Sequence, residues 1–302
     1  MMTHELLASG YDDKAIARMV RSGELHRVRH GAYAFGAQWR DLDESGRRLL
    51  TARAVLRSSR APTVLAGPSA AEVLGAPVWD LGDDVHVARL DGRSDRREAG
   101  KVPHRGRLLV DDVTVRRGLP VTSGTRTALD VMKSYDTEHA LVVVDGLLRA
   151  DETSIPLLER GCVSMRHDPD SLRMPIALAR ADERHESAGE TRSDYLMWRQ
   201  HLPRPVPQYE IVDRWGQVIA RLDFAWPGLG SFMEFDGKTK YLRHRRRGES
   251  VADAVLREKR REELVCGLTG WRCIRIVWAD LYHPERTAAR IRATLLGERW
   301  TA

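Results

Sequence analysis

The last part of the chain alternates between helical and strand patterns in one order: helix, three strands, helix, strand, helix. Pro203 ends the first helical stretch, and Pro284 stands in the first turn of the last one. Apolar and polar residues alternate in the fourth strand, as expected for a half-buried strand. We therefore predict an α/β unit over residues 176–302. Its elements lie at 186–202, 208–214, 218–226, 230–237, 250–267, 271–278 and 284–296.

Two further segments precede this unit. In residues 1–38, Ile16, Met19 and Val20 share one face of a short helix, and LHRVRHGAYAF follows as a hairpin that exposes Arg27 and Arg29. A helix followed by a basic hairpin is how a winged helix contacts DNA phosphates. The alternative is a small capping module with a solvated charged face. We predict a winged-helix-like module at 1–38 and a mixed α/β middle domain at 39–175.

The composition restricts the kinds of partner and compartment. The formal charge is +6 with a pI near 9.4, which favours anionic partners such as DNA. No apolar run approaches the ~18 residues of a membrane span, and no secretory signal is visible. The three cysteines include no CxxC pair, so neither a disulfide framework nor a paired-cysteine zinc site is expected. We predict a cytoplasmic protein without membrane association.

Acidic residues occur at three places in the last unit. Asp223 ends the second strand, Glu234 lies on the third strand, and Asp236 shares the face of Glu234. Glu190, on the preceding helix, completes the cluster. Burying several carboxylates is costly unless a cation neutralises them, and oxygen ligands suit Mg²⁺ or Mn²⁺. The residue types therefore predict a metal that activates water for phosphodiester hydrolysis.

A basic run follows the acids directly in GKTKYLRHRRR. Cations beside a carboxylate cluster would hold a nucleic-acid backbone near the metal. We expect Lys238 to orient or stabilise the attacking hydroxide. The predicted nucleic-acid-binding residues of this run are Lys240, Tyr241, Arg243, Arg245, Arg246 and Arg247.

The segment DFAWPGLGSFMEFDG resembles the PD-(D/E)XK superfamily, and is closest to its branch similar to very-short-patch-repair (Vsr) endonucleases. The resemblance covers about residues 181–298 and implies a restriction-endonuclease-like α-β-β-β-α-β core. It implies that Asp223 and Glu234 bind the metal with Glu190, and that Gln208 assists the water or a phosphate. It also implies a basic residue near the site, for which we take Arg260.

This sequence departs from the superfamily at one position. The lysine that normally stands two residues after the glutamate is replaced by Asp236. Lys238 or Lys240 would then have to reach back, or Asp236 would be a further metal ligand. The remaining alternative is a domain that has lost catalysis and kept nucleic-acid binding.

The upstream half, from RVRHGAYAF to VVVDGLLRA, resembles proteins with an AbiEi-family antitoxin N-terminal domain fused to such a nuclease-like domain. Our main prediction is a metal-dependent DNA endonuclease, in phage defence or DNA repair. The alternative is a non-catalytic DNA-binding transcriptional regulator, the antitoxin of a type IV toxin–antitoxin system, which carries an inactive nuclease-like domain. That alternative implies a toxin partner protein.

Overall fold

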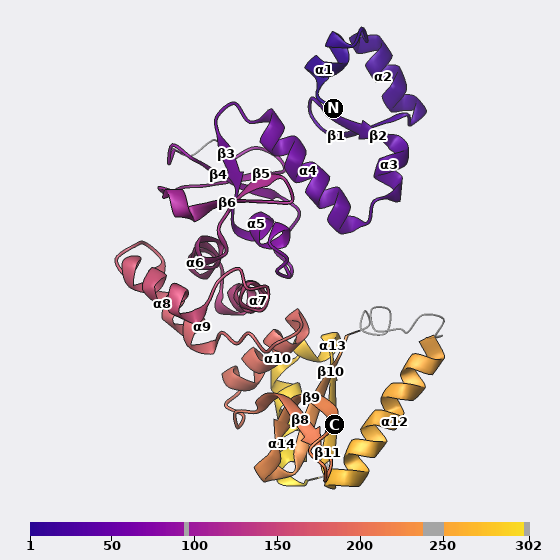
Figure 1. The fold of residues 1–302 in the computed structure, drawn as a ribbon, viewed down its shortest axis with the longest axis vertical. Helices are drawn as coiled ribbons and strands as arrows, with labels where there is room; N and C mark the ends of the chain where they lie inside the picture. Colours follow the sequence, from indigo (N-terminus) through magenta and orange to yellow (C-terminus); the bar gives the residue numbers. More distant parts are fainter. Residues whose placement is uncertain (94–96, 238–250, 299–302) are drawn as a thin grey trace. The chain divides into compact units, whose positions relative to one another are not determined.

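A computed structural model describes residues 1–93, 97–237 and 251–298 (Figure 1). The chain forms two compact units. Unit 1 comprises Met1–Val143 and Ala150–Leu178, and unit 2 comprises Val144–Arg149 and Ala179–Ala302. The predicted division into three segments stays a prediction, whereas the mixed α/β class is confirmed. Within the described ranges, no helix has the length and apolar character of a membrane span.

Unit 1 begins with two short helices and a hairpin. The Asp12 carboxylate accepts a hydrogen bond from Ala15 N (2.6 Å), which caps the second helix, and Gly23 ends that helix with a φ of 77°. Leu6, Ile16 and Leu25 pack together and join both helices to the hairpin. The elements are α1 (Thr3–Ala8), α2 (Asp13–Ser22), β1 (Leu25–Arg29), β2 (Ala32–Phe35) and α3 (Gly36–Asp41).

The remainder of unit 1 is built on a five-stranded sheet with the order β5-β4-β3-β7-β6. β3 pairs antiparallel with β4 and parallel with β7, β4 and β5 are parallel, and β6 and β7 form an antiparallel hairpin. The strands are β3 (Thr63–Leu65), β4 (Val85–Arg89), β5 (Lys101–His104), β6 (Val113–Arg116) and β7 (Leu119–Thr122).

Helices accompany this sheet along the chain. Ala54, on α4, packs with Met2 and Ala32, so α4 shares a small core with the N-terminal hairpin. The helices are α4 (Glu44–Ser58), α5 (Gly67–Val73), η1 (Val110–Asp112), α6 (Gly124–Ser134), α7 (Thr137–Arg149), α8 (Ile155–Ser164), η2 (Ser171–Arg173) and α9 (Met174–Arg180).

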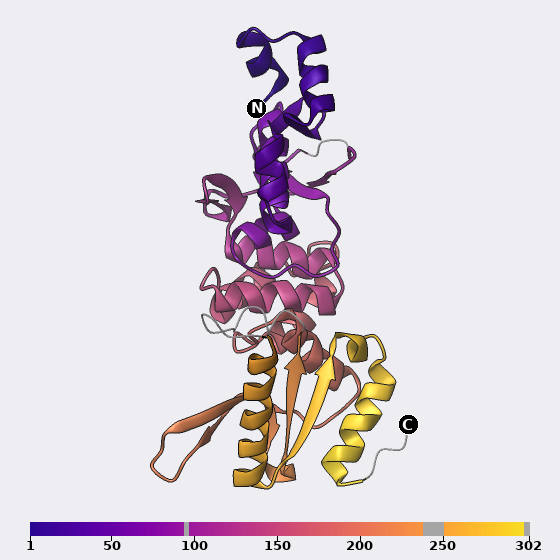
Figure 2. The same cartoon turned by 90° about the vertical axis from the view of Figure 1, so that its right-hand side faces the viewer.

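Unit 2 has the predicted order of helix, three strands, helix, strand and helix, with a short extra helix, α13. The sheet order is β11-β10-β9-β8, in which only β10 and β11 run parallel. Figure 2 shows the β8–β9 hairpin extending beyond the other strands. The elements are α10 (Ala188–Arg199), β8 (Val206–Val212), β9 (Val218–Trp226), η3 (Pro227–Leu229), β10 (Ser231–Asp236), α12 (Val251–Thr269), β11 (Arg272–Val277), α13 (Trp278–Leu281) and α14 (Pro284–Leu296).

Two apolar cores lie on the opposite faces of this sheet. Phe224 and Met233 pack with residues of α10 and α14 on one face, whereas Leu222 and Phe232 pack with Val265 of α12 on the other. This two-layer burial explains why β10 and residues 222–226 of β9 are almost continuously buried. Polar side chains in these stretches, such as Asp223 and Glu234, are therefore held inside the unit.

Candidate functional site

Helix α2 presents a row of positive charge to solvent. Ile16 is buried in the N-terminal core, and Met19 and Val20 pack against that core from the same face of the helix. Lys14, Arg18 and Arg21 are exposed. Because they stand at positions i, i+4 and i+7, these three side chains form one stripe on the outward face. This stripe was not among the residues predicted from the sequence, although its spacing opposite the apolar face was a signal for it.

The two arginines predicted on the hairpin after α2 have different surroundings. Arg27 is exposed, and its Nη2 donates to His30 Nδ1 at 2.7 Å near the turn. Arg29 has a side chain only 19% exposed, with its Nη2 3.7 Å from a Glu98 carboxylate oxygen. Arg27 is thus available to an anionic ligand, whereas Arg29 already has an anionic neighbour.

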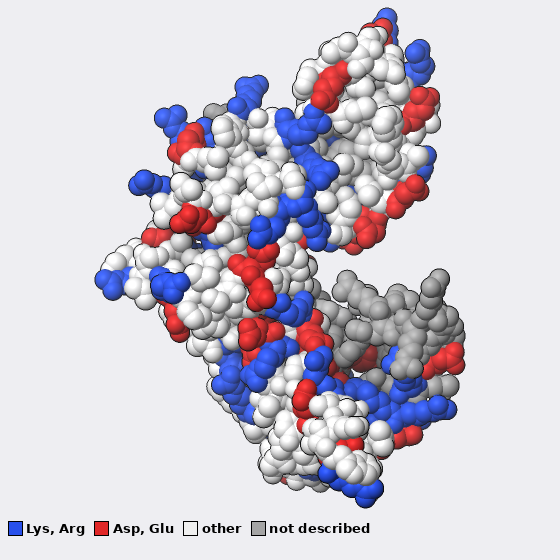
Figure 3. Space-filling model, in the orientation of Figure 1, with Lys and Arg blue, Asp and Glu red and all other residues white. Residues whose placement is uncertain are grey.

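Further basic residues line helix α4 of the same unit. In Figure 3 a run of blue side chains follows this helix. Arg47, Arg53 and Arg57 are exposed there, and Arg57 forms an ion pair with Glu5 of α1. The surface of unit 1 therefore carries positive charge beyond α2 and the hairpin.

The predicted helix-borne ligand, Glu190, has the contacts of a capping residue. Its Oε1 accepts a hydrogen bond from Ser187 Oγ (2.7 Å), and its Oε2 accepts from Glu186 N (2.9 Å). Ser187 Oγ in turn accepts from Glu190 N (3.2 Å), so the two side chains satisfy donors at the start of α10. Gln208 Nε2 also donates to Glu190 Oε2 at 2.8 Å. The structure thus brings Gln208 and Glu190 together, as a hydrogen-bonded pair.

Gln208 has an unusual backbone conformation within strand β8. Its φ is 52°, although the β8–β9 register is the same on both sides of it, at Pro207↔Phe224 and at Tyr209↔Leu222. A non-glycine residue in this region is strained by about 1–3 kcal/mol, and such strain clusters at functional sites. This register places Gln208 opposite Asp223 in the neighbouring strand.

Asp223 and Glu234 are buried on neighbouring strands, with exposed fractions of 7% and 3%. The antiparallel register of β9 and β10 includes Phe224↔Met233, the step next to both acids. Asp223 Oδ2 accepts from Phe235 N (2.8 Å), and Glu234 Oε1 accepts from Arg261 Nη2 (2.9 Å). The two acids are neighbours, as the sequence predicts, but their described contacts are with a backbone amide and an arginine.

Arginines also accompany Asp236. Arg275, on the parallel strand β11, places Nη1 3.2 Å from Asp236 and Nη2 2.6 Å from Glu262. Arg260, which we expected near the acids, is exposed, and the next residue of α12, Arg261, contacts Glu234 instead. The arginine of α12 beside the acids is therefore Arg261 and not Arg260. One residue along a helix corresponds to a rotation of about 100°.

The described ranges contain no group of three or more His, Cys, Asp or Glu side chains arranged to hold a metal ion. The metal role of Glu190, Asp223 and Glu234 stays a prediction, since each acid has a different partner. The remaining predicted residues lie outside the described part of the chain. These are Lys238, Lys240, Tyr241, Arg243, Arg245, Arg246 and Arg247.

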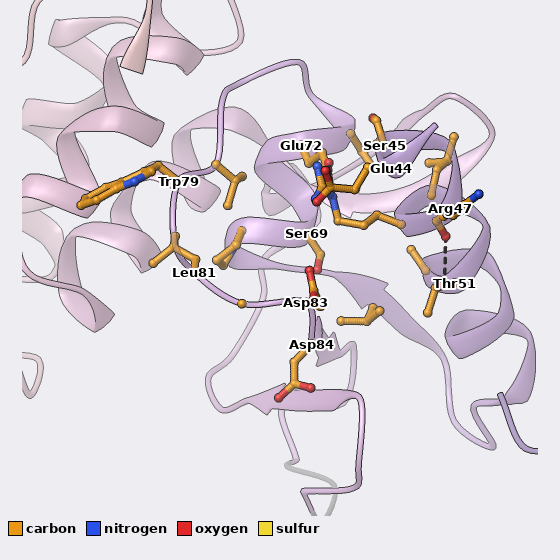
Figure 4. Close-up of a pocket in the computed structure, with 18 of the residues that line it drawn as sticks. Glu44, Ser45, Arg47, Thr51, Ser69, Glu72, Trp79, Leu81, Asp83 and Asp84 are labelled. Atoms are coloured by element: carbon orange, nitrogen blue, oxygen red, sulfur yellow. Dashed lines mark hydrogen bonds and ion pairs between the residues drawn. The ribbon is translucent and has the colours of Figure 1, made fainter. Parts of the chain in front are cut away.

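A cavity of about 810 Å³ lies in unit 1 between α4, α5 and the loop before β4 (Figure 4). Its lining mixes acidic and basic side chains, and Arg48 pairs with both Glu44 and Glu72. Asp83 and Asp84 approach it from the loop. The mixture of charges gives this cavity no single ligand preference.

A buried histidine of β4, His86, lies beside a partly buried histidine of β5, His104. His86 Nδ1 and His104 Nε2 are 2.8 Å apart, and Tyr135 Oη is 3.5 Å from His86. Burial lowers the pKa of His86 to about 4, with a further contribution from the charge that His104 carries when it is protonated, and burial also lowers the pKa of His104. Both rings are therefore neutral in the folded protein near neutral pH.

This burial predicts acid destabilisation of unit 1. Between pH 6.5 and 4 the unfolded chain binds a proton at His86 and the folded protein does not, so the free energy of unfolding falls as the pH falls. The full effect of His86 is about 3 kcal/mol, present above pH 6.5 and lost by pH 4. We expect His86→Gln to reduce the dependence of the free energy of unfolding on pH between pH 4 and 6.5, measured by urea titrations at several pH values. An unchanged pH dependence would show that His86 is not buried as a neutral group.

A second buried polar cluster belongs to unit 2. Asp145 accepts hydrogen bonds from Asp182 N (2.9 Å), His185 Nδ1 (2.8 Å) and Thr191 Oγ1 (2.8 Å). The side chains of Asp145 and His185 are each 2% exposed. Burial alone would lower the pKa of His185, but its hydrogen bond and charge interaction with Asp145 raise it. This cluster fixes the loop that leads into α10, which carries Glu190.

Comparison with known proteins now gives the relatives of this chain. Residues 3–36 match the family described as "Transcriptional regulator, AbiEi antitoxin". Two proteins of Mycobacterium tuberculosis are 30% identical over 275 residues, which are 90% of this chain and 93% of each relative. They are "Uncharacterized protein MT2308" of strain CDC 1551 / Oshkosh and "Uncharacterized protein Rv2248" of strain H37Rv. The chain belongs to the family of these two mycobacterial proteins.

Membership of this family extends over nearly the whole chain, whereas the AbiEi match covers α1, α2 and the β1–β2 hairpin. The predicted AbiEi resemblance at the N-terminus is thereby confirmed. The Vsr-like resemblance of the C-terminal part stays a prediction. A "Crystal structure of RV2827C protein from Mycobacterium tuberculosis" aligns with a TM-score of 0.40 and 20% identity, over 59% of this chain and 69% of that one.

Proposed function

We propose that this protein is a DNA-binding transcriptional regulator of the antitoxin kind, the alternative that the sequence analysis left open. The observation that carries the proposal is the stripe of Lys14, Arg18 and Arg21 on the outward face of α2. This helix lies inside the segment that matches the AbiEi transcriptional regulators. A helix that buries one face and exposes cations on the other is suited to the major groove of DNA.

In this proposal α2 is the recognition helix and the β1–β2 hairpin is the wing. Arg27 and the backbone near the hairpin turn contact phosphates beside the groove, while the short helix α1 supports α2 through Leu6. Antitoxins act with a toxin, so a toxin protein is the second partner that the proposal includes. Unit 2 then serves as a nuclease-like domain without catalytic activity.

Selection from a pool of random duplexes, followed by fluorescence anisotropy, tests this function. The full-length protein should enrich one sequence class and bind it more tightly than a scrambled duplex, with an affinity that falls steeply as salt increases. Equal affinity for selected and scrambled duplexes would contradict a regulator and leave only general polyanion binding.

A second candidate is metal-dependent cleavage of DNA by unit 2. The observation that favours it is the burial of Asp223 and Glu234 on neighbouring strands, next to the strained Gln208. The residues present do not by themselves make a three-carboxylate site, because Arg261 binds Glu234 and Arg275 binds Asp236. We therefore rank cleavage below regulation.

A plasmid-cleavage assay distinguishes the transcriptional regulator from the metal-dependent nuclease. We expect supercoiled plasmid to stay intact when it is incubated with the protein and Mg²⁺ or Mn²⁺, because arginines already neutralise two of the acids. Asp223→Asn and Glu234→Gln serve as matched variants. Metal-dependent nicking by the wild type that is lost in either variant would overturn the expectation and establish the nuclease.

A further inference from the structure

Strand β6 is an edge strand of the five-stranded sheet, and β7 is its neighbour. A two-residue turn, Arg117–Gly118, joins them, with φ values of 53° and 72°. Positive φ at both positions is the signature of a type I′ hairpin turn. Arg116 and Leu119 therefore form the closing hydrogen-bonded pair of the hairpin.

The pairing pattern decides which backbone groups of β6 face outward. In an antiparallel hairpin, hydrogen-bonded and non-hydrogen-bonded pairs alternate, so Thr114 also bonds to β7. Ser123 N donates to Asp112 O at 2.8 Å, which continues the same alternation beyond the strand. The N–H and C=O groups of Val113 and Val115 consequently point away from β7, toward the free edge.

This edge is exposed and partly apolar. The Val115 side chain is 63% exposed, and Val110, which precedes the strand, is 91% exposed. Val115 O accepts a weak hydrogen bond from Arg116 Nη1 at 3.2 Å. Exposed edges with apolar side chains pair readily with another strand unless the sequence prevents it.

The charges on this edge do not prevent pairing; they select its direction. Residues 111–117 read Asp-Asp-Val-Thr-Val-Arg-Arg, with both acids before Thr114 and both arginines after it. A second copy that runs antiparallel about Thr114 places each acidic end against a basic end. A parallel copy in register would place like charges opposite one another, which is unfavourable.

We propose that a second copy of this chain pairs with β6 in antiparallel orientation, so that the two five-stranded sheets become one continuous sheet. Val113 then lies opposite the partner's Val115, and Val115 lies opposite the partner's Val113. These are the residues whose N–H and C=O groups face outward, so the charge pattern and the backbone pattern select the same register. The hydrogen bond from Arg116 to Val115 O is replaced by one from the partner's Val113.

The flanking side chains supply the specificity of this pairing. Asp111 lies near the partner's Arg117, and neither Asp111 nor Arg117 has a side-chain hydrogen bond or ion pair with any residue that the structure describes. Asp112 and Arg116 are already paired, with Arg126 and Glu152. Because the strand is short, the contact is at the small end of protein interfaces, and the dimer dissociates on dilution.

The first test removes an outward hydrogen-bond donor without disturbing the sheet. Proline is tolerated at edge positions whose N–H faces solvent, so Val115→Pro should fold, as circular dichroism would verify. We expect sedimentation velocity from low to several hundred micromolar protein to show a monomer–dimer equilibrium for the wild type. We expect Val115→Pro to weaken dimerisation at least tenfold. A wild type that stays monomeric over this range overturns the proposal, and so does an equally dimeric, folded Val115→Pro.

The second test reverses charges to check the register. Asp111→Arg places two arginines opposite each other, and Arg117→Asp places two aspartates opposite each other, so each variant alone should be monomeric. An equimolar mixture should form a heterodimer, because both flanking pairs then have opposite charges. Arg160→Asp, on the exposed surface of α8, is the control and should dimerise like the wild type. Failure of the mixture to associate would overturn the register.

Discussion

Replacing Lys14, Arg18 and Arg21 together by glutamine lowers the affinity for the selected duplex about 100-fold, if α2 lies in the major groove. All three side chains are exposed on one face of a helix whose other face is fixed in the core by Ile16. The plot of log K against log salt should become shallower by about 2 to 3, because three phosphate contacts are lost. Anisotropy titrations at several salt concentrations measure both quantities.

The control is a variant with the same change of charge elsewhere. Arg160, Arg199 and Arg286 are exposed on α8, α10 and α14, outside the AbiEi-matched segment. Their joint replacement by glutamine should leave the salt slope within about one unit of the wild type. If the two triple variants lose affinity equally, the protein binds DNA through its overall charge and α2 is not the recognition helix.

Replacing Asp145 by alanine destabilises unit 2 by about 3–5 kcal/mol. The carboxylate accepts hydrogen bonds from three donors, and alanine leaves these donors buried without an acceptor, one of them on the His185 ring. The thermal midpoint of unit 2 should fall by about 10–20 °C. Hydrogen exchange followed on separate peptides distinguishes unit 2 from unit 1.

Asp145→Asn provides the conservative comparison, since it keeps the side-chain volume and one acceptor oxygen; a smaller loss is expected. Glu298→Ala removes a carboxylate from the exposed end of the same unit and should change stability by less than about 0.5 kcal/mol. A loss for Asp145→Ala no larger than that for Glu298→Ala would show that the cluster contributes no net stability.

Local patterns in the sequence were sufficient to predict several helices and strands, and to predict that certain residues lie near each other in space. The apolar spacing around Ile16 predicted helix α2, and the alternation after Gly23 predicted the β1–β2 hairpin. In unit 2 the order of elements was predicted correctly, and adjacency of the second and third strands placed Asp223 near Glu234. Helix and strand periodicity depends on nearby residues, so such patterns are visible in the sequence itself.

The arginines that form ion pairs with Glu234 and Asp236 could not be predicted from local patterns. Arg261 is 27 residues from Glu234, and Arg275 is 39 residues from Asp236. Whether Arg260 or Arg261 reaches the sheet depends on the rotation of α12 about its axis, which is set by the packing of Val265. The sequence-based interpretation placed a metal among these acids because the sequence pattern does not show that Arg261 pairs with Glu234 or that Arg275 pairs with Asp236.

The sequence by itself therefore determined helix α2, the β1–β2 hairpin and the order of the main helices and strands of unit 2. Only the tertiary structure decided that β6 is an edge strand, that His86 meets His104, and that Asp145 meets His185. The physical reason is the range of the interactions. Periodicity and capping act over a few residues, whereas burial and hydrogen bonding in the core join residues far apart in the chain, and they exist only after the sheets and helices have packed.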